Sequence, residues 1–215
     1  MPAAKNPLAN TIVLATRNRG KLAELEALLA GFGVRVLGLD AFPELGEIEE
    51  TGQTFAENAR LKARTVAQAT ALVALADDSG LAVDALAGAP GVYSARYSGA
   101  GTTDASNNAK LLETLRGVPE DRRGCRFISV VAAVAPNGAE IVAEGRWEGR
   151  VLESPRGLGG FGYDPLFFDP DLGRAAAELA PADKNARSHR GNALRALLRD
   201  WPGFWTRAAV DPNRP

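Results

Sequence analysis

The chain has 215 residues, 46% of them hydrophobic and 24% charged, which allows one substantial folded, soluble domain and argues against wholesale disorder. Lys+Arg number 25 against 26 Asp+Glu, so the formal net charge of −1 leaves no basic surplus for nonspecific binding to nucleic acid or an anionic membrane. The single cysteine, Cys125, and the single histidine, His189, exclude an intrachain disulfide, cysteine-based zinc sites and a two-histidine zinc centre.

The two ends of the chain lack an apolar period. Residues 1–10 do not contain the apolar run of a signal peptide, and no uncharged stretch is long enough to span a bilayer. We therefore expect a cytoplasmic protein with one domain over residues 11–205 and flexible tails at 1–10 and 206–215.

The first half of the chain alternates apolar runs with amphipathic segments. Residues 11–15 predict a buried strand, and leucines 22, 25, 28 and 29 predict a helix that stops at Gly31 or Gly33. A strand is expected over 34–39. Thr54 and Glu57 have the spacing of a capping box, which predicts a helix over about 55–69. Residues 71–76 predict another strand, ending abruptly at Asp77.

The second half adds hairpin character. The Gly- and Ser-rich segment 87–101 predicts a loop, and 104–116 a helix that carries Leu111, Leu112 and Leu115. Strands are expected over 126–134 and 139–147, joined at the turn signal 136–138. A Gly-rich loop over 157–164 and a helix over 188–201 follow. The whole pattern predicts one α/β domain with a mixed β-sheet flanked by helices.

Four polar clusters stand at the ends of apolar runs, where α/β sheets usually hold ligands. The first is the turn over residues 16–21, which contains Gly20 and runs into a helix. Its free amide hydrogens and the charge of Lys21 suit a phosphate. The P-loop spacing is absent, and on this segment alone an ordinary strand-to-helix turn with a solvated lysine is the preferred interpretation.

The second cluster is the pair Glu49 and Glu50, with Glu57 and Asn58 one turn into the next helix. Paired carboxylates suit Mg²⁺, which prefers oxygen ligands and keeps waters for a phosphate substrate. The alternative is a solvated acidic loop in which Glu57 serves only as a helix cap.

The third cluster, Asp77-Asp78-Ser79-Gly80, directly follows an apolar strand. Two adjacent carboxylates there are costly unless they are paired, capped or metal-bound. One of them could position Mg²⁺ or take a proton from an attacking water. The alternative is an Asx-type turn with Gly80 at positive φ, but two acids are more than such a turn needs.

The fourth cluster is split between the glycine loop around Phe161 and Tyr163 and the segment from Lys184 to Arg190. An aromatic ring among glycines can stack on a nucleobase, and nearby cations can donate to keto oxygens. The alternatives are core packing for both rings and a surface position at a helix N-terminus for His189.

Taken together and in this order, these segments resemble the inosine-triphosphatase family, the dITP/XTP nucleoside-triphosphate pyrophosphatases. The resemblance covers essentially residues 11–198. It rests on six ordered motifs, which are Thr16-x-Asn18-x-x-Lys21, Glu49-Glu-Thr-Gly-x-Thr-Phe-x-Glu-Asn-Ala59, Ala76-Asp-Asp-Ser-Gly-Leu81, Gly91-Val-Tyr-Ser-Ala-Arg-Tyr-Ser-Gly99, Gly160-Phe-Gly-Tyr-Asp-Pro165 and Ser188-His-Arg-Gly191.

The resemblance implies an α/β fold with two lobes around a central substrate cleft, usually a homodimer. It implies Mg²⁺-dependent hydrolysis of deaminated purine nucleoside triphosphates (ITP, dITP, XTP) to a nucleoside monophosphate and pyrophosphate, which keeps them out of DNA and RNA. Small-molecule triphosphates are then the partners, with neither nucleic acid nor membrane involved.

The same resemblance assigns roles to individual residues. Glu49 and Asp78 would hold Mg²⁺, and Asp78 would also accept the proton of the water, with Glu50 and Asp77 as second candidates. Lys62 would assist with the triphosphate. The substrate-binding residues by motif are Thr16, Asn18, Lys21, Ser79, Phe161, Gly162, Tyr163, Asp164, Lys184, His189 and Arg190. Among them Phe161 would stack on the purine, and Lys184, His189 and Arg190 would face its 6-keto side.

One position departs from the family pattern, because Arg17 stands where many relatives carry Gly or Ser. Two other functions stay open at this point. One is a pyrophosphatase of the related septum-associated family, acting on pyrimidine or methylated nucleotides, and the other is a non-catalytic module that binds nucleotides or nucleic acid. Substrate profiling separates the first, and salt-dependent DNA binding without turnover would indicate the second.

Overall fold

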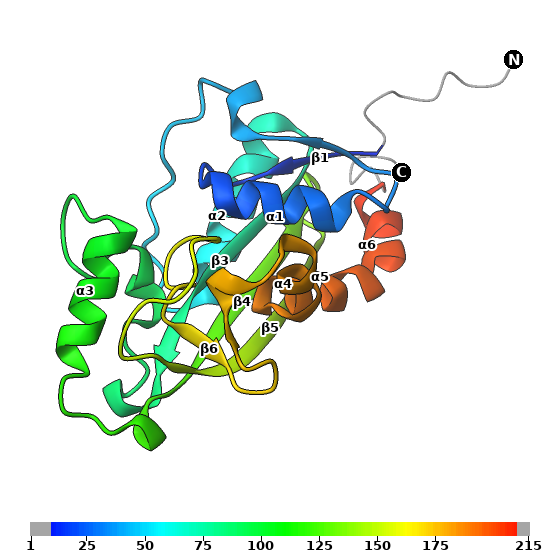
Figure 1. Cartoon of the computed structure of the whole chain (residues 1–215). Coiled ribbons are helices and arrows are strands. Elements are labelled where there is room, and N and C mark those ends of the chain that lie inside the picture. The colour runs from blue at the N-terminus through cyan, green and yellow to red at the C-terminus, as the bar shows by residue number, and fades with distance from the viewer. Residues whose placement is uncertain (1–9, 210–215) are drawn as a thin grey trace, which may run out of the picture. The chain divides into compact units, whose positions relative to one another are not determined.

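A computed structural model of the protein describes residues 10–209, and Figure 1 traces the chain. The helices are α1 (Arg19–Leu29), α2 (Phe55–Thr70), α3 (Asp104–Thr114), α4 (Pro181–Arg187), α5 (His189–Arg199) and α6 (Trp201–Ala208). The strands are β1 (Thr11–Leu14), β2 (Arg35–Leu37), β3 (Val73–Val83), β4 (Gly124–Val134), β5 (Glu140–Val151), β6 (Phe167–Asp169) and β7 (Arg174–Ala175).

The described strands form a mixed, seven-stranded sheet in the order β2-β1-β3-β4-β5-β6-β7. β1 runs parallel to both β2 and β3, whereas β6 is antiparallel to β5 and β7. The parallel part needs crossover helices, which α1 and α2 supply between successive strands. The expected mixed sheet flanked by helices is therefore confirmed, and the central cleft stays a prediction.

The chain divides into two compact units, and β3, β4 and β5 each contribute to both. The first unit covers residues up to 78, 130–143 and from 193 onward. Its sheet carries apolar side chains on both faces. Ile12 and Leu14 lie in one core with α1, α5 and α6, while Val13 lies in a second core with α2. Alternate strand residues point to opposite faces, so helices cover both sides.

The second unit covers residues 79–129 and 144–192. Its core joins the apolar face of α3, through Leu111 and Leu115, to aromatic side chains of the sheet. Phe127, Trp147 and Phe167 stack there with ring centroids 4.5–6.4 Å apart. Tyr163 of the glycine loop belongs to the same core. This packing anchors the loop that carries Phe161.

The expectation that a strand ends at Asp77 is wrong. β3 continues through Asp77, Asp78, Ser79 and Gly80 to Val83, and Gly80 is not among the residues with positive φ, so the alternative of a turn is wrong as well. Within this strand Gly80 is required by close approach. A Cβ there would lie 2.4 Å from the carbonyl oxygen of Gly91 and from Ser94 Oγ. The two aspartates therefore sit inside a strand rather than at its end.

Other boundaries shift by smaller amounts. Residues 87–101 are not all loop, because a 3₁₀ segment spans Gly91–Arg96. The expected helix over 188–201 is two helices, α5 and α6, and the preceding α4 was not expected. Residues 206–208, expected in the C-terminal tail, complete α6. The rest of the two expected tails, at 1–9 and 210–215, lies outside the described residues.

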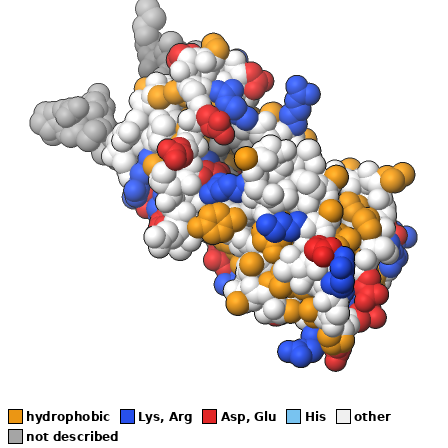
Figure 2. Space-filling view, turned by 90° about the vertical axis from the view of Figure 1, so that its left-hand side faces the viewer, with side chains coloured by type: hydrophobic (Ala, Val, Ile, Leu, Met, Phe, Trp, Pro, Cys, Tyr) orange, Lys and Arg blue, Asp and Glu red, His pale blue; other side chains and the backbone are white. Residues whose placement is uncertain are grey.

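Acidic and basic side chains are interspersed on the face that Figure 2 shows, as the near-zero net charge predicts. A large field of one sign is absent from that view. That nucleic acid is not a partner stays a prediction. Among the described helices, we find none with the length and apolar character needed to cross a membrane.

Candidate functional site

The first predicted cluster forms a capped turn at the start of α1. Asn18 is the N-cap, and its Oδ1 accepts a hydrogen bond from the Lys21 amide at 3.1 Å. Thr16 Oγ1 accepts from the Asn18 amide at 3.2 Å. These bonds shape the turn over residues 16–21 and leave it at the positive end of a helix, which is a favourable place for an anion.

Lys21 connects this turn to the third cluster. Its Nζ lies 2.9 Å from Asp77 Oδ2, and the Asp77 side chain is fully buried. The pairing follows from topology, because β1 and β3 are parallel neighbours and Leu14, the last residue of β1, is paired with Leu75, so the turn after β1 lies beside the middle of β3. A buried carboxylate needs such a partner. Asp77 therefore serves to hold the ammonium of Lys21 beside β3.

Lys62 of α2 gathers the remaining acidic groups. Its Nζ lies 2.8 Å from Glu50 Oε1, 3.1 Å from Asp78 Oδ1 and 2.9 Å from the backbone oxygen of Asp77, to which it donates. The Lys62 and Asp78 side chains are 10% and 6% exposed, so this is a nearly dry ion pair. The family resemblance predicted only that Lys62 would assist in binding the triphosphate. In the structure its ammonium contacts Glu50, Asp77 and Asp78.

Burial and charge act in opposite directions on this pair. Burial raises the pKa of the Asp78 carboxyl above its ordinary value, although Lys62 and Lys21 oppose the shift. For Lys62, burial lowers the pKa, but Asp78 and Glu50 together more than offset that effect, so the pKa lies above its usual value. A carboxylate with a raised pKa is a better proton acceptor than a solvated one.

Asn58 completes the surroundings of Asp78. It is fully buried near the start of α2, and its Nδ2 donates to Asp78 Oδ2 at 3.2 Å. Its Oδ1 accepts from the Gly52 amide at 2.7 Å. The helix itself starts at the predicted capping box, in which Thr54 and Glu57 bond each other's backbone amides. Asn58 thus connects Gly52, at the end of the acidic loop, to the Asp78 carboxylate.

The two glutamates of the acidic loop differ in environment. Glu50 is half-buried and bonded to Lys62, whereas Glu49, the predicted metal ligand, is exposed. Within residues 10–209, no three side chains of His, Cys, Asp or Glu are grouped as a complete metal cage. Mg²⁺ commonly uses only one or two protein carboxylates and takes its other oxygens from phosphate and water. The donor set Glu50 and Asp78, with Glu49 nearby in sequence, fits such an ion.

The glycine loop of the fourth cluster is a tight turn built on Asp164. Asp164 Oδ2 accepts from the Phe161 amide at 2.8 Å and pairs with Lys184 Nζ at 2.5 Å. Gly160 has φ +72° and a Cβ there would lie 2.1 Å from Asp164 Oδ2, so only glycine fits. Asp164 and Lys184 are both buried. Asp164 thus shapes the glycine loop and holds Lys184, and its predicted part in binding substrate stays a prediction.

Two cations approach the ring of Phe161. Lys184 Nζ lies 4.7 Å and Arg190 Cζ 5.7 Å from its centroid. Arg190 is almost completely buried, and its Nη2 donates to Ser79 Oγ at 3.0 Å. The structure thus brings together four of the residues predicted to bind substrate, and Ser79 is joined to Asp78 by one peptide bond.

His189 and Tyr163, two of the residues predicted to bind substrate, are both buried, and their part in binding stays a prediction. The imidazole of His189 stacks on Phe127 at 4.7 Å with an interplanar angle of 18°, so the alternative of a surface histidine is wrong. The Tyr163 hydroxyl donates to the Ser94 carbonyl at 2.9 Å. Burial raises the pKa of Tyr163, which keeps this donor protonated. Both side chains support the loop and helix that carry Phe161 and Arg190.

The chain was compared with known protein families, curated proteins and solved structures. Residues 12–200 match the model of the Ham1 family. The chain belongs to the Ham1 family. It is 62% identical over 201 residues to a protein named dITP/XTP pyrophosphatase from Nitratidesulfovibrio vulgaris, covering 91% of this chain and 97% of that one. A protein of the same name from Geobacter sulfurreducens is 53% identical and covers 90% of this chain and 96% of its own length.

A solved structure agrees with this assignment. The Ham1 protein from Coxiella burnetii is 46% identical and superposes with a TM-score of 0.81, covering 90% of this chain and 98% of that one. The family resemblance stated from six motifs is therefore confirmed. Arg17, which departs from the family pattern, is exposed and its guanidinium donates to the Leu45 carbonyl. It connects the turn over residues 16–21 to Leu45, which precedes Glu49 and Glu50.

Three polar residues make contacts at this site that the sequence motifs do not predict. Asn58 was noted only as part of an acidic cluster, yet it bonds Asp78. Asp104 and Asn108 of α3 bond the two backbone groups of Gly162. A buried asparagine in a helix, and an Asp–Asn pair at i and i+4, are the signals that were present. Neither pattern identifies the bonded residue, because Asp78 is 20 residues from Asn58 and Gly162 is 58 residues from Asp104.

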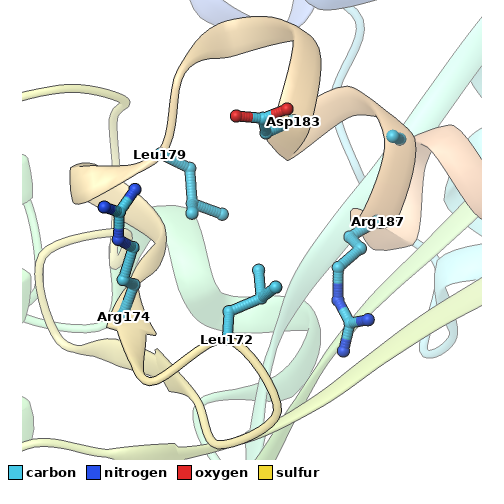
Figure 3. A pocket seen from close by; sticks show the side chains of 6 residues that line it. Leu172, Arg174, Leu179, Asp183 and Arg187 are labelled. Carbon is cyan, nitrogen blue, oxygen red and sulfur yellow. The ribbon is translucent and has the colours of Figure 1, made fainter.

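A separate cavity of about 370 Å³ lies in the second unit, and Figure 3 shows it. The leucine side chains point toward its centre and charged groups stand around them. Its lining consists of Leu172, Arg174, Leu179, Asp183, Ala186 and Arg187. None of these is a predicted site residue. Arg187 is already bonded to Asp169 and Asp171.

Proposed function

We propose that this chain hydrolyses deaminated purine nucleoside triphosphates, namely ITP, dITP and XTP, to the nucleoside monophosphate and pyrophosphate. The observation that carries the proposal is the buried Asp78 carboxylate, held by Lys62 and Asn58 and followed directly by Ser79. Relatives named dITP/XTP pyrophosphatase, aligned over nine-tenths of the chain, support the same reaction.

The triphosphate is assigned to the turn of Thr16, Asn18 and Lys21. A helix N-terminus with its amides free of carbonyl partners attracts phosphate oxygens, and Lys21 adds a full charge. Asp77 keeps that charge in place by a buried ion pair. Binding at this turn would bring the phosphates beside the part of β3 where Asp78 lies.

Asp78 is the proposed proton acceptor for the attacking water. Lys62 and Asn58 each donate to one of its oxygens, which fixes the plane of the carboxylate. Its raised pKa suits an acceptor that must take a proton near neutral pH. Lys62, held at a high pKa, stays charged and prevents the cluster of Glu50 and Asp78 from repelling the phosphates.

Mg²⁺ is the proposed cofactor, with Asp78 and Glu49 or Glu50 as its ligands. When bound, it supplies positive charge that offsets the negative charge developing on the phosphate oxygens. The contact between Glu50 and Lys62 supports Glu50 over the residue chosen from sequence. Hard oxygen donors and a phosphate substrate are the setting in which Mg²⁺ is used.

The base is assigned to Phe161, Lys184 and Arg190. Phe161 offers a stacking surface, and the two cations could donate to a 6-keto oxygen, whereas the 6-amino group of adenine presents a donor where that acceptor would be. A polar mismatch of that kind discriminates by roughly 10⁴-fold. His189 supports Arg190 from the core, and Gly162 and Tyr163 shape the loop. A homodimer in the cytoplasm, as the family resemblance implies, is part of the proposal.

The test is a panel of triphosphates assayed with and without Mg²⁺. We expect turnover of ITP, dITP and XTP far above that of ATP and of pyrimidine triphosphates, and loss of turnover in Asp78→Asn with the fold intact. Asp121→Asn, the same change at an exposed position, is the matched control and should keep full activity. Preference for pyrimidine or methylated nucleotides would favour the septum-associated class, and normal rates in Asp78→Asn would remove that residue from the chemistry.

A further inference from the structure

The loop that carries Phe161 has glycines on both sides of the aromatic ring. Gly160 and Gly162 have φ of +72° and +60°. A Cβ on Gly162 would meet nothing within 4 Å, so packing does not constrain the backbone at that position. Glycine is the most flexible residue, and a ring flanked by two of them needs an external restraint to keep one position.

Helix α3 supplies that restraint with two side chains. Asp104 Oδ2 accepts from the Gly162 amide at 2.6 Å, and Asn108 Nδ2 donates to the Gly162 carbonyl at 2.9 Å. The two residues are four apart and share one face of the helix. The amide belongs to the peptide that joins Phe161 to Gly162, and the carbonyl to the next peptide. Both peptide planes that flank Gly162, the residue directly after the ring, are therefore held, while the Phe161 amide on the other side is held by Asp164.

The helix itself is firmly placed. Leu111 and Leu115 are fully buried in the core of the second unit. Asn107 donates to the carbonyls of Ser94 and Ala95, and Thr103 caps the helix through the Ser106 amide. The two side chains that reach Gly162 are not part of that core, since Asp104 is exposed and Asn108 half-buried. Their contacts with the loop are thus separable from the packing of the helix.

We infer that Asp104 and Asn108 are positioning residues that set the Phe161 ring against the donors of Lys184 and Arg190, and so sharpen the choice of 6-keto over 6-amino purines. The inference rests on the proposed function. It follows from geometry, because Lys184 is fixed to Asp164 inside the turn and Arg190 to Ser79 on β3. Because both cations are held, the position of the ring relative to them depends on the peptide planes that Asp104 and Asn108 hold.

Two readouts test the inference on the full chain. The first is hydrogen exchange at the Gly162 amide, which we expect to be at least about tenfold faster in Asp104→Ala than in wild type. The second is calorimetric binding of IMP and AMP without metal. IMP binding should weaken about tenfold in Asp104→Ala, the loss expected for one charge-assisted hydrogen bond, while weak AMP binding stays constant.

Kinetics should show the same selectivity. In Asp104→Ala and Asn108→Ala we expect KM for ITP to rise about tenfold with kcat within about twofold, so that the ITP-to-ATP ratio falls. Asp104→Asn keeps an acceptor oxygen and should restore most of the ratio. Thr103→Ala is the matched control, because it removes the helix cap at the same end of α3 without touching Gly162 and should lower stability but leave the ratio unchanged.

The outcomes are distinct. An unchanged ITP-to-ATP ratio and IMP affinity in Asp104→Ala, or an equal fall in Thr103→Ala, would overturn the positioning role. A wild type that turns over no triphosphate would refute the proposed function alone, since exchange at Gly162 and IMP binding still decide the role of Asp104. A wild type that binds neither IMP nor AMP would overturn both.

Discussion

Removal of the Lys62 ammonium is the perturbation whose cost follows most directly from the structure. Lys62→Met keeps most of the side-chain length and deletes the charge, which leaves Asp78 and Glu50 without their shared partner. Breaking a buried ion pair from one side costs about 3–5 kcal/mol. Glu50 is 28% exposed and can be rehydrated, and Lys21 still lowers the pKa of Asp78, so we expect the lower end, about 3 kcal/mol, near pH 8.

The deficit should depend on pH in one direction. Burial already raises the pKa of Asp78 above its unfolded value, and the loss of Lys62 raises that pKa further. A carboxyl whose folded pKa is raised destabilises the fold when it is ionised and does so less as it takes up its proton. The cost of Lys62→Met is therefore largest above the raised pKa of Asp78 and shrinks as the pH falls toward about 4, the ordinary aspartate value.

Thermal and urea unfolding at about pH 8 and about pH 5 measure this deficit. A loss of about 3 kcal/mol in a chain of this size lowers Tm by roughly 6–12 °C. Lys110→Met is the control, because Lys110 is exposed and only overlies the Tyr97 ring, a contact worth at most about 1 kcal/mol. Asp78→Asn added to Lys62→Met should recover stability. A deficit below about 1 kcal/mol near pH 8, or one that grows on acidification, would refute the reasoning.

Three further changes test separate parts of the site. Glu50→Gln should raise the Mg²⁺ concentration needed for half-maximal activity, measured by metal titration, more than Glu49→Gln does. The reverse order would favour Glu49, the ligand predicted from the sequence. Arg190→Lys keeps a charge but not the planar donor to Ser79, so the ITP-to-ATP preference should fall about tenfold in competition assays, and an unchanged preference would contradict the base assignment. Thr54→Ala removes the cap of α2 and should cost about 1 kcal/mol in urea unfolding, whereas a neutral result would mean that the capping box contributes nothing.

Local signals in the sequence were sufficient for most elements of the fold. The alternation of strands and helices, the capping box at Thr54 and the turn at Gly138 depend on residues a few positions apart. The course of β3 depended on distant partners. Asp77 and Asp78 lie buried inside the strand with Lys21 of α1 and Lys62 of α2 as their charge partners, and no local pattern indicates those partners.

For the site as well, the sequence predicted which residues take part but not which of them contact one another. Motifs identified the residue types and their order, but they did not distinguish a side chain that faces a ligand from one that supports it. His189 and Tyr163 carry the chemistry of ligand-binding groups and are buried against Phe127 and Ser94. Asn58 looked like an ordinary helical residue and bonds Asp78. Such support contacts join segments far apart in the chain, so they require the folded structure.

Analysis of the products formed from dITP tests the central claim most directly. Wild-type protein is incubated with dITP and Mg²⁺, and the products are resolved by chromatography and phosphorus NMR. We predict equal amounts of deoxyinosine monophosphate and pyrophosphate, no orthophosphate, and neither product in Asp78→Asn. Release of orthophosphate with the diphosphate, or no turnover of dITP, ITP or XTP under any metal condition, would contradict it.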